Sequence, residues 1–209
     1  DRNFVFGPEE KEHLRLLLRM YERFSGCRIL SYCLMSNHIH VLLEVPPGCE
    51  KGESLGLSDE ELLWRLGGLY SRNRTRLVQR ELEEARGLME GRTPDGEVVG
   101  EGETARRKRM FEDGERRVRE VHEYYSYRMH SLSEFFKGML HRFTCWFNRK
   151  RERKGTLWES RFRSVMVQDG LAARTMAAYI DLNPVRAGIV DDPADYRWSS
   201  YGEAVGGGR

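Results

Sequence analysis

A charge-dense segment in the middle of the sequence most constrains how these 209 residues can fold. From Glu101 to Glu120, 13 of 20 residues are charged, and glycine recurs through the twenty residues before them. Such a segment buries too little apolar surface to build a core of its own. The sequence therefore predicts one core domain in two halves, residues 1–46 and 131–201. Between them lies an insertion at 47–130, and a flexible tail follows at 202–209.

Helix and strand signals follow one another in the two flanking halves. Pro8 suits the first turn of a helix, and Gly26 suits its end. Ser131 and Glu134 form a capping box that opens an apolar stripe at helical spacing, and Ser58 with Glu61 repeats this signature in the insertion. The predicted elements of the core are a helix from Pro8 to Gly26, strands at 28–34 and 38–45, a helix from Ser131, a strand at 161–168 and a helix at 171–182.

The order of these elements predicts the fold class. Two strands separated only by Ser36-Asn37 should form an antiparallel hairpin. With one more strand at the start, the order becomes the ferredoxin-like β-α-β-β-α-β sheet, followed by a C-terminal helix. We interpret Asn3 to Phe6 as a remnant of that first strand, which is otherwise missing. The expected fold is thus α+β, with an insertion that is helical from Ser58 to Leu82 and alternates between exposed helix and disorder beyond.

Composition and charge narrow the function classes. No apolar run approaches the roughly 20 residues that span a bilayer, so no membrane partner is expected. The four cysteines are scattered without a C-x-x-C pair, which favours reduced thiols in a cytoplasmic protein. Net charge is only +2, yet residues 142–163 hold eight Lys or Arg and two Glu. This basic segment indicates either a phosphate-binding face or a solvated helix end with its loop.

Two small groups of residues could carry chemistry. His38 and His40 flank Ile39 in a predicted strand, so both imidazoles lie on one face and could share a divalent cation. Tyr179 and Asn183 lie one turn apart on the last helix. Each group also has a plain structural explanation: two partly exposed histidines on a hairpin, a tyrosine at the rim of the core, and a helix C-cap.

Four blocks together resemble the single-tyrosine HUH transposases, a family that includes the IS200-like and the REP-associated tyrosine transposases. The resemblance is nearer to the REP-associated branch. They are YCLMSNHIHVLLE at 32–44, LWESRF at 157–162, YIDLNPVRAGIV at 179–190 and DYRWSSY at 195–201. The resemblance implies that Tyr179 is the nucleophile and that His38, His40 and Asn183 bind the metal. Two nitrogens and one amide oxygen suit Mg²⁺ or Mn²⁺.

The resemblance also implies an activity and partners. The expected protein is a metal-dependent transposase that cleaves and rejoins single-stranded DNA, with a hairpin, through a 5′-phosphotyrosine intermediate. The alternatives are a non-catalytic protein that binds DNA hairpins and a structural zinc site that includes Cys33. A cytoplasmic protein that associates with the nucleoid is expected, as a monomer or a homodimer. The residues expected to contact DNA are Arg149, Lys150, Arg151, Arg153, Lys154, Trp158, Arg161, Arg163 and Arg186.

Overall fold

A computed structural model describes residues 6–206 of the chain, which divide into two units. The sheet unit comprises Asp1–Glu22, Cys27–Val45 and Leu132–Arg209, and the helical unit comprises Arg23–Gly26 and Pro46–Ser131. Of the interpreted first-strand remnant, only Phe6 lies within the described residues, and its backbone N–H donates to the carbonyl of Ser36 at 2.9 Å.

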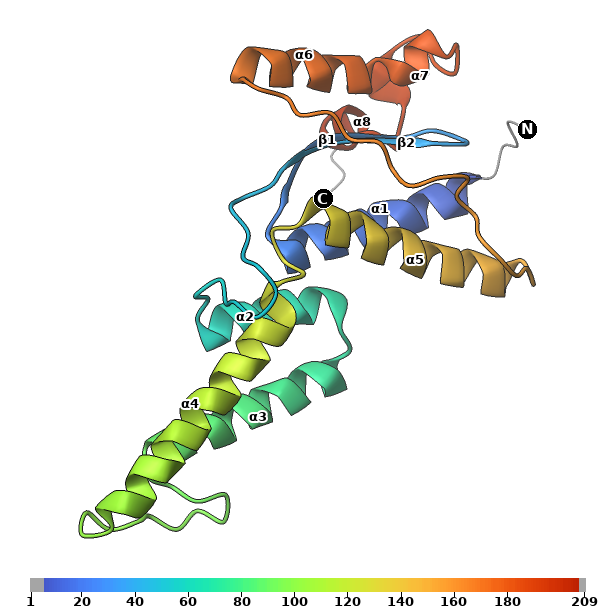
Figure 1. Cartoon of the computed structure of the whole chain (residues 1–209). Helices are drawn as coiled ribbons and strands as arrows, with labels where there is room; N and C mark the ends of the chain where they lie inside the picture. Colours follow the sequence, from blue (N-terminus) through green and yellow to red (C-terminus); the bar gives the residue numbers. More distant parts are fainter. Residues whose placement is uncertain (1–5, 207–209) are drawn as a thin grey trace. The chain divides into compact units, whose positions relative to one another are not determined.

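The sheet unit is built on an antiparallel hairpin of β1 (Arg28–Leu34) and β2 (Ile39–Glu44). The register pairs Leu34 with Ile39 and Cys33 with His40, as the predicted hairpin requires. Figure 1 shows α6 (Gly170–Asp181) on one side of the hairpin and α1 (Pro8–Ser25) with α5 (Leu132–Lys150) on the other. The structure is thus a mixed α and β fold, but the described residues form a two-stranded sheet and not the full ferredoxin-like one.

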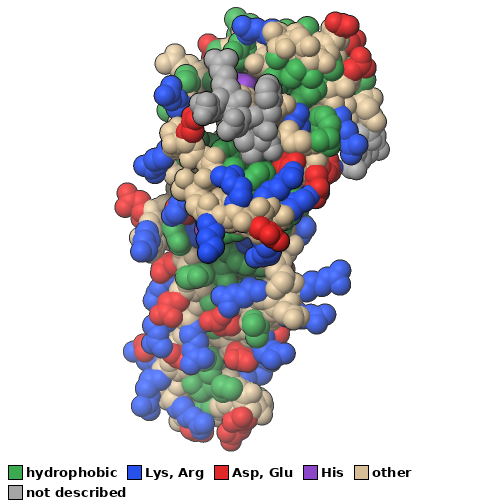
Figure 2. Space-filling model, turned by 90° about the vertical axis from the view of Figure 1, so that its right-hand side faces the viewer, with side chains coloured by type: hydrophobic (Ala, Val, Ile, Leu, Met, Phe, Trp, Pro, Cys, Tyr) green, Lys and Arg blue, Asp and Glu red, His purple; other side chains and the backbone are tan. Residues whose placement is uncertain are grey.

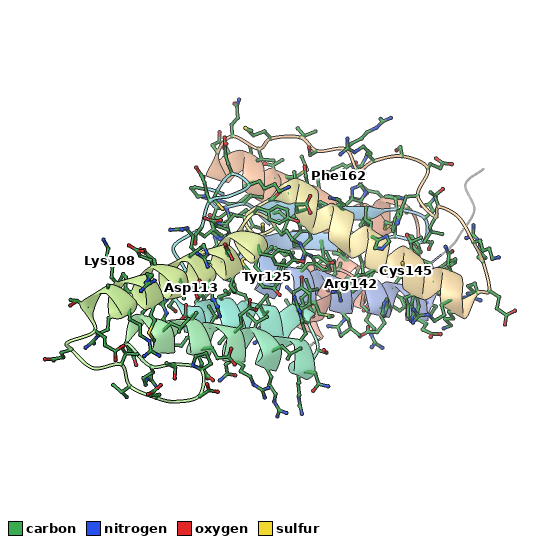
Figure 3. All side chains as sticks on the ribbon, turned by 60° about the horizontal axis from the view of Figure 1, so that its bottom comes forward. Lys108, Asp113, Tyr125, Arg142, Cys145 and Phe162 are labelled. Atoms are coloured by element: carbon green, nitrogen blue, oxygen red, sulfur yellow. The ribbon has the colours of Figure 1, made fainter. Side chains whose placement is uncertain are left out.

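The predicted third strand at 161–168 was wrong. These residues belong to neither a helix nor a strand, and Val165 and Met166 are 83% and 89% exposed. Only Phe162 makes a ring contact, on Phe136 of α5, with centroids 4.8 Å apart (Figure 3). Strand propensity describes how well side chains fit a pleated surface, so it forms a strand only where a partner strand is available. This segment has no such partner among the described residues.

An apolar cluster attaches α6 to the hairpin. Cys33, Met35, Leu42 and Ile180 are buried together, with Met176 and Ala177 of α6 packed against them. At the end of α6, the Asp181 carboxylate accepts hydrogen bonds from two hydroxyls, those of Ser31 in β1 at 3.2 Å and of Ser200 at 3.0 Å. Packing and hydrogen bonds together therefore set the position of α6 on the sheet.

The last helix, α8 (Ser200–Val205), includes residues 202–205 of the predicted flexible tail. The chain reaches α8 through α7 (Asn183–Arg186) and a 3-10 turn, η1 (Pro193–Asp195). Before α8, the carbonyl of Trp198 accepts a hydrogen bond from the backbone of Leu34 at 2.9 Å, which places this segment at the free edge of β1.

Glu203 of α8 joins three elements through its carboxylate. It accepts hydrogen bonds from Arg15 at 2.7 Å and Arg19 at 2.5 Å, both on α1, and from the Tyr32 hydroxyl of β1 at 3.0 Å. Burial alone would raise the pKa of this carboxyl, but hydrogen bonds and the positive charge of Arg19, aided by Tyr32 and Arg15, lower the pKa below its ordinary 4.5.

We expect Glu203→Gln to lower the free energy of unfolding by about 1 kcal/mol at pH 7, because Arg15 and the more exposed Arg19 lose the charge of a largely buried partner. A carboxyl whose pKa is lower in the folded state stabilises fully above its unfolded pKa, and the contribution disappears as the pH falls through the folded value. Urea unfolding at a series of pH values should therefore show the two proteins converging below pH 4.5. Glu44→Gln, at an exposed pair with Arg28, is the control and should change little. A difference independent of pH would contradict this account.

The helical unit contains three helices: α2 (Asp59–Leu69), α3 (Arg72–Met89) and α4 (Thr104–Ser126). The predicted helix at 58–82 begins as expected, with Ser58 accepting from the Glu61 N–H at 3.1 Å, but it breaks at Tyr70. Helices α3 and α4 pack closely, because a Cβ at Gly114 would lie 2.4 Å from the Ala85 carbonyl.

The surface of α4 explains the charge density of this segment. Lys108 and Asp113 lie on this helix, with Tyr125 near its C-terminal end (Figure 3). Lys108 pairs with Glu112, and Asp113 pairs with Arg116 and Arg117. Figure 2 shows acidic and basic side chains intermixed over the face of α3 and α4 that it presents. Within the described part of the chain, no helix is both long and apolar enough to span a membrane.

Candidate functional site

The turn between β1 and β2 holds the first candidate residues. The Met35 backbone N–H donates to the His38 carbonyl at 2.9 Å, which leaves Ser36 and Asn37 as a two-residue loop. From α1, the buried Lys11 ammonium donates to the Ser36 hydroxyl at 3.4 Å and to the Tyr196 hydroxyl at 2.9 Å. Through Lys11, these contacts connect the tip of the hairpin to α1 and to Tyr196.

His38 and His40 lie side by side, as strand alternation predicts. Their Nε2 atoms are 3.0 Å apart, and their rings are nearly perpendicular at 88°. His40 lies opposite Cys33 and two residues before the buried Leu42, so both histidines occupy the face of the hairpin that α6 covers.

Asn37 orients His38 and was not among the residues that the sequence analysis selected. Its side-chain oxygen lies 2.6 Å from Nδ1 of His38. An amide oxygen only accepts hydrogen bonds, so Nδ1 carries the proton and Nε2 presents its lone pair toward His40. The position of this asparagine, directly before the histidine in a tight turn, was the signal available in the sequence.

Both imidazoles are shifted toward the neutral form. Burial lowers the pKa of His38, and burial together with repulsion from His38 lowers the pKa of His40. Neutral imidazole is the form that binds metal ions, so little proton competition is expected at neutral pH.

Tyr179 lies beside this pair. Its ring centroid is 6.3 Å from that of His40, and the ring is 44% exposed. The next residue, Ile180, is buried in the cluster that holds α6 on the hairpin. Since successive helical residues differ by about 100° around the axis, burying Ile180 and Met176 presents the neighbouring Tyr179 at the edge of this interface, next to His40.

Two residues of α7 complete the surroundings of Tyr179. The guanidinium carbon of Arg186 lies 4.7 Å from the centre of the tyrosine ring. The Asn183 amide nitrogen donates to the Tyr179 carbonyl at 2.8 Å, and its oxygen has no hydrogen bond among the described residues. Asn183 therefore caps the end of α6 with one side of its amide and leaves its oxygen available as a ligand.

The donor set fits a divalent cation. Two ligands at right angles, each about 2.1 Å from a metal ion, are about 3.0 Å apart. The two Nε2 atoms lie at this separation, 3.0 Å. Within the described residues, no group of three or more His, Cys, Asp or Glu side chains could hold a metal ion. A third protein ligand would accordingly be an amide oxygen, and the role of Asn183 stays a prediction.

The residues expected to contact DNA have varied environments. Lys150 forms an ion pair with Glu9 of α1, and Arg151 forms one with Glu10 at 2.6 Å. The Trp158 indole N–H donates to Thr144 at 3.0 Å, and its ring packs on Phe6 and Phe143, so this tryptophan has a packing role in the fold. The remaining basic residues of this set are exposed, and their DNA contacts stay predictions: Arg149, Arg153, Lys154, Arg161, Arg163 and Arg186.

Comparison with known families identifies the N-terminal part of the chain. Residues 1–53 match the family model described as "Transposase IS200 like". The match covers about a quarter of the 209 residues and includes His38 and His40, which confirms the resemblance for this part. No curated protein and no solved structure matches the chain.

Proposed function

We infer that this chain, whose residues 1–53 match the IS200-like transposases, is a metal-dependent transposase that cuts and rejoins single-stranded DNA with Tyr179. The family match suggests transposase function in general. The mechanism is our proposal, and one observation carries it: two histidine nitrogens 3.0 Å apart lie beside a tyrosine from a distant part of the sequence.

In this proposal the Tyr179 hydroxyl oxygen attacks a DNA phosphorus atom. The bond between phosphorus and the 3′-oxygen breaks, a tyrosine–phosphate bond forms, and the departing oxygen leaves as a 3′-hydroxyl while the phenol gives up its proton. A phenol has a pKa of about 10, so it needs nearby positive charge to react at neutral pH. Arg186, with its guanidinium over the Tyr179 ring, contributes such charge. The step keeps the number of phosphoester bonds, so a second 3′-hydroxyl can reverse it and join strands.

His38, His40 and the Asn183 oxygen would hold Mg²⁺ or Mn²⁺. The ion would polarise the scissile phosphate and offset the charge that develops on its oxygens. Asn37 supports this site, because its hydrogen bond fixes the proton of His38 on the nitrogen that faces away from His40.

We assign substrate binding to the C-terminal end of α5 and to the basic segment that follows this helix. Arg149, Arg153 and Lys154 are exposed there and would contact backbone phosphates. The resemblance suggests a DNA hairpin as the structured part of the substrate.

The proposal is tested by incubating the protein with a labelled single-stranded oligonucleotide that contains a hairpin, with Mg²⁺ or Mn²⁺ and with EDTA. We expect a covalent protein–DNA product only with metal, and digestion followed by mass spectrometry should place the nucleotide on Tyr179. Folded protein that binds this DNA without forming the product would support the non-catalytic hairpin-binding alternative instead.

A further inference from the structure

The helical unit carries an exposed tryptophan under an arginine. Trp64 of α2 is 54% exposed, and the guanidinium carbon of Arg23 lies 4.5 Å from the centre of its ring. The Arg23 Nε also donates to the Trp64 carbonyl at 3.0 Å. One turn further along α2, a Cβ at Gly68 would lie only 2.7 Å from Cδ of Arg23. The absence of a side chain there lets Arg23 lie flat along the helix.

A hollow of about 210 Å³ adjoins this pair. Gly67 links the two features, because it lines the hollow and its Cβ position would be 3.5 Å from Nη2 of Arg23. The other lining residues are Tyr70 and, from the first turns of α3, Arg72, Thr75 and Arg76. Arg72 and Arg76 are four residues apart on α3, so both lie on the same face of the helix, about 6 Å apart along its axis.

The charge of this surface is not balanced. No carboxylate lines the hollow, and Arg23, Arg72 and Arg76 form no ion pair with any described residue. On α4 of the same unit, Arg106, Arg116 and Arg117 each pair with a neighbouring carboxylate, so their charge is compensated. The exposed Trp64 beside a hollow lined by the unpaired Arg72 and Arg76 distinguishes this surface from those paired positions on α4.

We propose that an insertion surface on the helical unit binds a single strand of DNA. It comprises Arg23, Trp64, Gly67, Tyr70, Arg72 and Arg76. The arginines contact successive phosphates, and an unpaired base stacks on Trp64 or enters the hollow beside Tyr70. Charge complementarity selects a polyanion, and the aromatic ring selects one with exposed bases. The choice of DNA rests on the proposed function.

The test is binding of a fluorescent, unstructured oligodeoxynucleotide in EDTA, measured by fluorescence anisotropy over a range of salt concentrations. For the double variant Arg72→Gln, Arg76→Gln, the slope of log affinity against log salt should fall by about 1.4, because each lost phosphate contact on a single strand contributes about 0.7. Trp64→Ala should weaken binding about 5- to 100-fold. The matched control is Arg116→Gln, Arg117→Gln, which removes the same charge from paired positions and should bind like the wild type.

A second readout uses the wild-type protein and is therefore independent of the stability of any variant. Ultraviolet cross-linking of the wild-type protein to an oligonucleotide with 4-thiothymidine should label peptides that contain Trp64 or Tyr70. Unchanged binding by both surface variants, equal weakening by the α4 control, stronger binding of the matching RNA, or cross-links only elsewhere would each overturn the proposal. Formation of the covalent product by the surface variants is scored separately, so failure of this surface and failure of the cleavage mechanism are distinguishable.

Discussion

Replacing Tyr179 with phenylalanine should abolish covalent attachment of DNA, with a loss of roughly 10⁴-fold or more in the rate of cleavage. The change removes only the oxygen that attacks phosphorus. The ring is 44% exposed and its hydroxyl makes no hydrogen bond among the described residues, so the free energy of unfolding should stay within about 0.5 kcal/mol of the wild type. Single-turnover cleavage, with the product separated on a denaturing gel, measures the effect.

Tyr201→Phe is the matched control. Tyr201 lies in the same unit, on α8, and is also 44% exposed. It lies outside the histidine site, so its variant should cleave at the wild-type rate. A covalent product that persists in Tyr179→Phe would show that another group attacks the DNA.

Replacing His40 with alanine should lower the rate of metal-dependent cleavage roughly 10³-fold at micromolar Mn²⁺. The rate should recover in part at millimolar metal. His40 supplies one of two nitrogens that lie 3.0 Å apart, and one imidazole alone holds Mg²⁺ or Mn²⁺ weakly. Binding of Mn²⁺, followed by electron paramagnetic resonance, should weaken together with the loss of cleavage. Tyr179→Phe should bind Mn²⁺ normally, which separates loss of the nucleophile from loss of the metal.

His141→Ala is the control for the histidine substitution. His141 is exposed on α5, next to Cys145. Its replacement removes one imidazole and should leave Mn²⁺ affinity and cleavage unchanged. If His40→Ala cleaves DNA with unchanged metal dependence, the histidine pair is not the metal site.

Local signals explain which elements could be predicted. Pro8 and Gly26 bound the first helix as expected, since Gly26 adopts a φ of 71° that other residues rarely adopt. Ser58 caps α2 through its own side chain. These signals act within a few residues of each other. The segment 161–168 failed because a strand needs a partner from elsewhere, and neighbouring residues contain no information about that partner.

Strand alternation alone placed His38 and His40 on one face, and the order of motifs alone suggested Tyr179 and Asn183. The sequence by itself did not show which apolar residue of the second strand packs against the last predicted helix. The structure buries Leu42, on the histidine face, against Ile180 of α6. This packing brings Tyr179 to His40, with Arg186 over the tyrosine ring. The contacts of Leu42 with Ile180 and of His40 with Tyr179 join residues about 140 positions apart, and they depend on how apolar faces fit in three dimensions.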